Sequence, residues 1–248
     1  MFEIEQIRRA KLESLQLERL KKIIAWAYEK STFYQKAFRR HGVAPDDIQS
    51  LNDVCKLPFV TSEDIRGNES DILTLPLSGV VRVSRLGGIK KFYTKGDIRN
   101  SVEMLIRAFI STYVLRGSTV SLEGDLSDSR LLDVLYALES IGATVVLPGT
   151  ENSGVDVTVR LKEDIVSYKN FNLFAPPEIG HAGLLYPCEA GYHVQEDHFL
   201  IEILNDELVV TALTAQAFPL IRYRTRQSAE KIFESCPCGR TFTRIQLR

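Results

Sequence analysis

The sequence predicts an α/β protein: amino-terminal helices, then a sheet core that contains a βαβ unit, then a carboxy-terminal region rich in β-strands. Three observations lead to this prediction. Apolar residues recur at helical spacing near the amino terminus, a strand–helix–strand pattern covers 119–147, and short β-branched and aromatic runs dominate after residue 172. Because the composition shifts near residue 150, we expect a helical and α/β part over 1–150 and a β-rich part over 151–248.

The amino-terminal part begins with two helices. The first is expected over 10–30, where apolar residues form one stripe among Lys, Arg and Glu. Ser31 and Thr32 can cap the second helix, which should end at Gly42 because glycine readily takes a left-handed conformation. A capping box that starts at Thr61 opens a further short helix.

A hairpin and the βαβ unit follow. Two strand-like runs flank a glycine turn within 80–93, and Thr94 caps a helix whose apolar face reaches Tyr113. A strand, a helix and a second strand are then expected at 119–123, 127–141 and 143–147. Their short connections predict parallel strands joined by a right-handed crossover. Residues 148–172 show no regular pattern. Three more short strands are expected at 199–204, 207–213 and 220–225.

Charge and hydropathy argue against two classes of partner. The chain has 248 residues, with 31 Lys and Arg against 32 Asp and Glu, so its net charge of −1 gives no overall attraction to nucleic acid or to an anionic membrane. No stretch approaches the roughly 18 apolar residues of a membrane span, and the amino terminus lacks a signal-peptide core. We therefore expect a cytoplasmic protein with neither a nucleic-acid nor a membrane partner.

Cysteine and histidine residues gather in the last third of the chain. Cys188 and His193 form one pair, and Cys236 and Cys238 form a second pair further on. Zinc prefers thiolate and imidazole ligands, and two ligand pairs from separate hairpins are a usual way to build a tetrahedral site. Four protein ligands would close the site, so the predicted zinc is structural. Two alternatives stay open: reduced cysteines beside a surface histidine, or His198 as the fourth ligand.

Other motifs have both a structural and a functional interpretation. Gly87 and Gly88, followed by two lysines, could cradle a phosphate, although a two-glycine turn is more often the tip of a hairpin. The run 220–226 alternates apolar or aromatic residues with arginine. It is either a half-exposed strand with a solvated basic face or a strand whose arginines hold an anionic ligand. Cys55 stands apart and is interpreted as a small buried apolar residue.

Longer segments carry a resemblance to a known family. They read STFYQKAFRRHGVAPDDIQSLNDVCKLPFVTSEDIR near the amino terminus, and EAGYHVQEDHFLIEI, ELVVTALTAQAFPLIRYRTR and CPCGRTFTRI near the carboxy terminus. Together they resemble the phenylacetate-coenzyme A ligases of the adenylate-forming superfamily. The middle is less similar, although ESIGATVVLPGT resembles a strand after a helix in that family. Several relatives carry the same Cys, His and Cys-x-Cys positions, so the resemblance also implies zinc.

The family activates an aryl or fatty carboxylate with ATP and magnesium and then passes the acyl group to coenzyme A, so the resemblance implies a nucleotide site. The family's phosphate loop, typically SSGTTGKPT, corresponds here to 84–91, which is shorter and lacks the row of hydroxyls. The resemblance places Phe174 near adenine, Glu178 near magnesium and Gln227 at the ribose. Pro177 stands where the family has a hydroxyl residue, and Gln227 stands where it has an aspartate.

Two pieces of the family's sequence also lack a counterpart. Part of the body before the Glu178 motif is missing, and the chain stops at Arg248, where the hinge to the mobile terminal domain would begin. The leading hypothesis is therefore a shortened, degenerate homologue with structural zinc and impaired adenylation, which binds a ligand or partner. The alternative is an active AMP-forming acyl-coenzyme A ligase, or one subunit of a split ligase. The expected ligand is a small carboxylate or a nucleotide. Apolar surface exposed by trimming would favour a homodimer or a partner subunit.

Overall fold

The computed structural model describes residues 2–125, 127–147, 150, 154–162, 165–168, 171–174, 176, 178–179, 185–188 and 191–248. Of residues 162, 165–168, 171–174 and 185–187 it describes the backbone alone. The helices are α1 (Arg9–Lys30), α2 (Thr32–His41), α3 (Ser62–Ile65), α4 (Glu69–Ile72), α5 (Lys95–Ser111) and α6 (Ser129–Ile141). The strands are β1 (Arg82–Leu86), β2 (Ile89–Tyr93), β3 (Thr119–Glu123), β4 (Thr144–Val146), β5 (Val157–Lys162), β6 (Ile165–Tyr168), β7 (Phe171–Phe174), β8 (Leu185–Cys188), β9 (Gly191–Val194), β10 (Phe199–Leu204), β11 (Glu207–Ala212), β12 (Tyr223–Ile232) and β13 (Arg244–Leu247).

The helix caps lie where the sequence predicts them. The Ser31 hydroxyl accepts a hydrogen bond from the Tyr34 amide at the start of α2, and Gly42 ends that helix with φ +65°. Thr61 caps α3, and Thr94 caps α5 in a capping box that its third residue, Asp97, completes. α5 ends at Ser111, although the predicted apolar face reaches Tyr113, because Tyr113 has a left-handed φ of +64° that no helix can continue.

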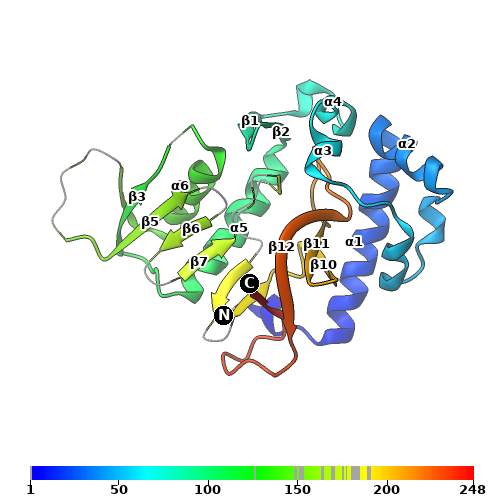
Figure 1. The fold of residues 1–248 in the computed structure, drawn as a ribbon. Coiled ribbons are helices and arrows are strands. Elements are labelled where there is room, and N and C mark those ends of the chain that lie inside the picture. Colours follow the sequence, from blue (N-terminus) through cyan, green and yellow to red (C-terminus); the bar gives the residue numbers. More distant parts are fainter. Residues whose placement is uncertain are drawn as a thin grey trace.

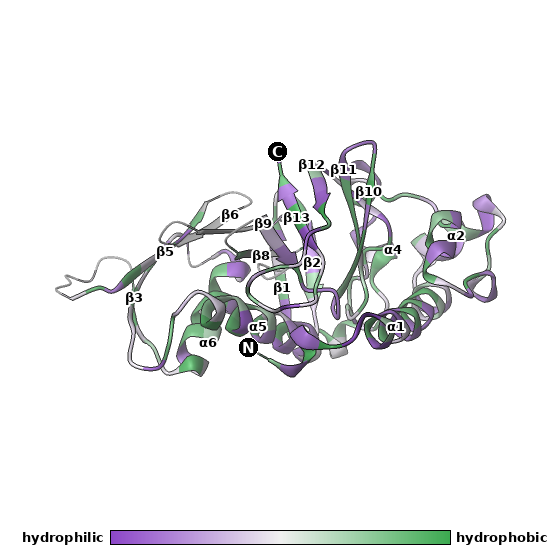
Figure 2. Cartoon of the chain, turned by 90° about the horizontal axis from the view of Figure 1, so that it is seen from below, coloured by the Kyte–Doolittle hydropathy of each residue, from purple (hydrophilic) through white to green (hydrophobic). Residues whose placement is uncertain are grey.

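Strands form three sheets, and α1 and α2 lie at the opposite end of the molecule from the five-stranded sheet (Figures 1 and 2). β1 and β2 form a hairpin. A six-stranded sheet has the order β10-β11-β12-β13-β9-β8, and a five-stranded sheet has the order β4-β3-β5-β6-β7. β3 and β4 are parallel and α6 connects them, which confirms the predicted βαβ unit.

The prediction for residues 148–172 is wrong, because this stretch contains β5, β6 and the first two residues of β7. β5 pairs with β3 in parallel, and β6 and β7 extend the sheet in antiparallel pairs. The signal was present: in β5, Val157 and Val159 are buried and alternate with Thr158 and Arg160. β12 also begins later than predicted, at Tyr223, because Arg222 has a left-handed φ of +49°.

Two hydrophobic cores fill the interior. The larger core joins α1, α2 and the 3-10 segment Leu51–Lys56 to the six-stranded sheet. The smaller core lies between the carboxy-terminal half of α5, α6, β3 and β5. Each core contains residues from both sides of residue 150, so the interior does not divide at that position.

The second face of the five-stranded sheet is polar along β3 and β5. Val120, Leu122, Val157 and Val159 are buried in the core that contains α5 and α6. Their neighbours along β3 and β5 point the other way. They are Thr119, Ser121, Glu123, Thr158 and Arg160, and the last pairs with Glu123 across the strands. Along β3 and β5, this face therefore does not carry the apolar surface that we expected from trimming. None of the helices in the described ranges is long and apolar enough to cross a membrane.

Candidate metal centre and nucleotide positions

The first pair of predicted metal ligands lies on one hairpin. Cys188 ends β8 and pairs with Gly191, and His193 follows on β9, where it pairs with Arg244 of β13. Gly191 has φ +87°, and a Cβ at this position would lie 2.6 Å from the Ile245 carbonyl oxygen. The close approach of β13 to the hairpin therefore requires glycine here.

The second pair lies on the loop between β12 and β13. Gly239, directly after Cys238, has φ +79°, and its amide donates to the Cys236 carbonyl oxygen over 3.1 Å. This tight turn brings Cys236 and Cys238 to the β8–β9 hairpin. One ligand atom from each of the four residues lies within 4.8 Å of the others. Cys188 Sγ is 3.0 Å from Cys236 Sγ, and His193 Nε2 is 3.2 Å from Cys238 Sγ.

His193 is oriented as a metal ligand. Its side chain is fully buried, which excludes the alternative of a surface histidine. Burial lowers its pKa to about 4, so the imidazole is neutral at neutral pH. Nδ1 lies 3.0 Å from the Phe242 carbonyl oxygen and donates to it in the neutral ring. The lone pair is therefore on Nε2, which faces the thiols, and the Phe242 carbonyl provides the outer-shell contact that metal-ligating histidines usually have.

The thiols differ in acidity. Burial and hydrogen bonds with Cys238 and Cys188 raise the pKa of Cys236 to about 12. Burial also acts to raise the pKa of Cys238, but hydrogen bonds from Cys236 and Arg240 outweigh it and the pKa is lowered. Cys238 thus ionises before Cys236. A cation that binds here would displace the remaining protons, because thiolate is the form that binds metal.

The other two cysteine and histidine predictions have different outcomes. His198 is not in the cluster: its Nδ1 lies 2.9 Å from Thr214 Oγ1 and its Nε2 lies 3.5 Å from Asp197. The alternative in which His198 is the fourth ligand is therefore wrong. Cys55 is exposed, and its carbonyl oxygen accepts a hydrogen bond from Arg222, so the buried position predicted for it is also wrong.

At the phosphate-loop position, the chain forms a closed hairpin. Ser84 pairs with Lys91 and Leu86 pairs with Ile89, which leaves Gly87 and Gly88 as a two-residue turn. The Lys91 side chain points inward. It is buried against the Phe218 ring, and its ammonium donates to the Glu178 carbonyl oxygen. Burial lowers the pKa of Lys91 to about 7. The structure thus supports the interpretation of Gly87 and Gly88 as a hairpin tip. The ammonium group of Lys91 is too far inside the protein to contact a phosphate bound at this turn.

The three residues assigned to the nucleotide by resemblance are placed as follows. The side chain of Phe174 lies outside the described residues, and so does Pro177. Glu178 is half-buried, and the described residues offer its carboxylate no hydrogen-bond partner. Gln227 lies on β12, and its side-chain amide donates to the carbonyl oxygens of Ser228 and Arg248 over 3.0 and 2.8 Å. Both hydrogens of that amide are already used.

The arginines of the 220–226 run are each engaged with an acidic residue. Arg222 is buried, and its Nη2 lies 2.8 Å from Glu202. Arg224 pairs with Glu207, and Arg226 pairs with Glu63 over 2.6 Å. The hypothesis of an arginine row that holds an anionic ligand is therefore not supported. Sequence reasoning missed these pairs because the three partners lie far from the arginines in the chain.

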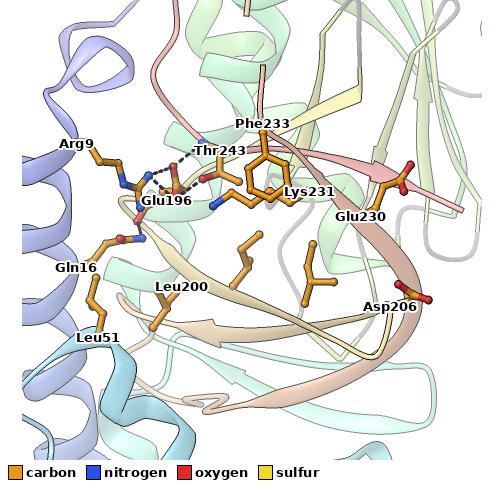
Figure 3. A pocket seen from close by; sticks show the side chains of 12 residues that line it. Arg9, Gln16, Leu51, Glu196, Leu200, Asp206, Glu230, Lys231, Phe233 and Thr243 are labelled. Atoms are coloured by element: carbon orange, nitrogen blue, oxygen red, sulfur yellow. Dashed lines mark hydrogen bonds and ion pairs between the residues drawn. The ribbon is translucent and has the colours of Figure 1, made fainter. Parts of the chain in front are cut away.

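Two cavities in the described part of the chain were not predicted. One, of about 560 Å³, is lined by residues that include Gln16, Leu200, Ile203 and Lys231 (Figure 3). The other, of about 370 Å³, lies beside Phe59. Neither includes Glu178 or Gln227. The lining residues come from separate elements and share no local motif, so the sequence carries no signal for either cavity.

Known proteins provide a further comparison. No family model matches the chain. It is 25% identical to the phenylacetate-coenzyme A ligase of Thermus thermophilus over 316 residues, which cover 98% of this chain and 71% of that protein. It is 28% identical to the corresponding ligase of Aromatoleum evansii, over 90% of this chain and 67% of that protein. The chain is a relative of the phenylacetate-coenzyme A ligases.

Solved structures of adenylate-forming ligases share the fold of this relative. A 2-hydroxyisobutyryl-CoA ligase, in an open conformation with 2-HIB-AMP and CoA, superimposes with a TM-score of 0.81 at 15% identity. The superposition covers 97% of this chain and 70% of that one. The match to the Thermus ligase extends over 316 residues, which is more than the 248 residues of this chain. Residues of that ligase inside the matched stretch therefore have no counterpart here, which agrees with the predicted loss of part of the body.

Proposed function

We propose that this phenylacetate-coenzyme A ligase relative holds a structural zinc ion and does not adenylate a carboxylate by itself, so that its role is to bind a ligand or a partner. The β1–β2 hairpin is the observation that supports the lack of adenylation. It closes on a two-residue turn where the family has its phosphate loop. Backbone amides and hydroxyls that would otherwise surround a phosphate are replaced by the ladder of a hairpin.

Zinc is supported by the donor set and its surroundings. Three thiols and one imidazole nitrogen within 4.8 Å match a closed Cys₃His site, which leaves no position for substrate. The site connects β8 and β9 to the loop before β13, so it would fasten the carboxy-terminal end of the six-stranded sheet. Its contribution is therefore to the folding free energy.

Metal analysis tests the proposal of a structural zinc ion. Protein prepared without a polyhistidine tag should contain about one zinc per chain. The double variant Cys236→Ser with Cys238→Ser should lose the metal and unfold at a lower temperature. Cys55→Ser, at an exposed cysteine outside the cluster, is the matched control and should keep both properties. Metal-free wild-type protein that is as stable as the loaded protein would contradict a structural role.

A retained ligase activity is the second candidate function, and Glu178 is the observation that favours it. Its carboxylate makes no hydrogen bond to the described residues and so stays available for magnesium, as the resemblance implies. The chain would then act on a small aryl or fatty carboxylate, alone or with a partner subunit in the cytoplasm. ATP–pyrophosphate exchange with a panel of such acids decides between the two. We expect no exchange above background, whereas exchange that Glu178→Gln abolishes would establish the ligase.

A further inference from the structure

The groove of about 560 Å³ runs along the free edge of β10. β10 stands at the end of the six-stranded order and pairs with β11. Side chains on opposite faces of β10 line the groove: Leu200 on one face, Ile201 and Ile203 on the other. A cavity that touches both faces of a strand passes along its edge. Figure 3 shows α1 on one side of this groove and β12 curving around the other.

The register of β10 and β11 shows which backbone groups face the groove. Leu204 pairs with Glu207 around a two-residue turn in which both residues have positive φ, +50° and +63°, as in a type I′ hairpin. In such a hairpin, alternate residues beginning at Leu204 bond to the partner strand. Ile201 and Ile203 therefore direct their N–H and C=O groups outward. Within the described ranges, these four groups have no hydrogen-bond partner.

Gln16 of α1 continues this edge. Its Nε2 donates to the carbonyl oxygens of Glu196 and Phe199, over 2.9 and 3.3 Å. Because only the NH₂ group can meet two carbonyls, the orientation of the amide is fixed. Its Oε1 is buried and has no partner among the described atoms, and Gln16 lines the groove. A buried acceptor left unpaired destabilises the protein, so the site gains from a ligand that brings an N–H group.

The charges around the groove indicate what the ligand carries. Arg9 pairs with Glu196, and Glu230 pairs with Arg248. Lys231 also lines the groove, near the exposed Phe233 ring, and has no acidic partner in the described part of the chain. The floor is apolar. Asp206 also lines the groove and has no cationic partner among the described residues, so the groove offers one unpaired cation, Lys231, and one unpaired anion.

We propose that the free edge of β10 binds an extended peptide segment of a partner protein, which adds a strand to the sheet and places a carboxylate at Lys231. The added strand pairs with the outward N–H and C=O groups of Ile201 and Ile203, and the apolar side chains of the peptide cover the groove floor. α1 and β12 flank this edge of β10 (Figure 3). This inference depends neither on the metal nor on nucleotide binding.

A hexapeptide with blocked ends, Glu-Leu-Val-Val-Thr-Ala, is a suitable probe because it copies β11, which already pairs with the other edge of β10. Its addition should slow hydrogen exchange at the Ile201 and Ile203 amides at least tenfold. The same peptide with N-methyl groups on alternate residues should give no protection, because it cannot complete the ladder. Equal protection by both peptides, or by neither, would overturn the proposal.

Two variants test the charge. Lys231→Glu should weaken binding of this peptide at least tenfold, whereas Lys90→Glu, an exposed lysine on β2 outside the groove, should leave it unchanged. Unchanged unfolding temperatures would show that both variants fold. If Lys231→Glu bound the peptide as tightly as the wild type, the ligand would not place a carboxylate at Lys231, and this part of the proposal would be overturned. Protection of both amides in the free protein, lost on dilution, would show that a second copy occupies the edge, and would also overturn the proposal.

Discussion

Gln227, which the resemblance assigns to a ribose, contacts the protein's own backbone. The sequence allowed Gln227 and the arginines of the 220–226 run to contact a ligand, and the structure engages them with the protein's own groups. Such pairing cannot be predicted from the sequence, because the partner residues come from other elements. The Cys/His cluster was predictable because the chemistry of Cys and His restricts their use, and each pair is close in the sequence.

His198 gives a prediction for the dependence of stability on pH. Burial lowers its pKa from 6.5 to about 4, although the neighbouring Asp197 opposes the shift. Because the folded-state pKa lies below the unfolded-state pKa, the unfolded chain takes up the proton first as the pH falls. The contribution of His198 is therefore complete above pH 6.5 and is lost progressively down to about pH 4, by roughly 3 kcal/mol.

Chemical denaturation of the wild type and of His198→Asn at several pH values measures this effect. The wild type should lose more unfolding free energy than the variant between these two pH values. His41→Asn, at an exposed position on α2, should lose as much as the wild type. Equal losses in the wild type and in His198→Asn would contradict the assignment.

At the scale of helices and strands, the sequence predicted those features that neighbouring residues determine. The caps at Ser31, Thr61 and Thr94 were predictable because one side chain and the nearby amides decide them. The late start of β12 was not, because the left-handed conformation of Arg222 depends on contacts from two other segments. Its guanidinium donates to the Cys55 and Leu57 carbonyl oxygens and pairs with Glu202 of β10.

Arg222 therefore fastens β12 to β10 and to the segment before α3. Arg222→Met should lower the free energy of unfolding by about 3–5 kcal/mol, because it leaves the largely buried Glu202 carboxylate without its partner. Arg226→Met removes a solvent-exposed pair with Glu63 and should cost far less, because water screens the two charges. Urea denaturation of both variants measures the difference. Equal losses would show that the Arg222 pair is not buried in solution.

Over the whole molecule, two cores connect distant parts of the chain. Both cores draw on distant parts of the chain, which the position of a composition shift could not show. The residues on the open side of β3 and β5 are polar, so this face needs no further layer of helices. The fold is shared with the solved ligase, and the residues that the resemblance assigns to a phosphate loop form a hairpin.

The central claim is that this architecture persists without the nucleotide chemistry. Calorimetric titration of the zinc-loaded protein with magnesium ATP tests it most directly. With the β1–β2 hairpin closed, Lys91 buried and the Gln227 amide engaged, we predict no measurable binding up to about 1 mM, a level that corresponds to about 4 kcal/mol of binding free energy. Saturable binding with a micromolar Kd would contradict the account.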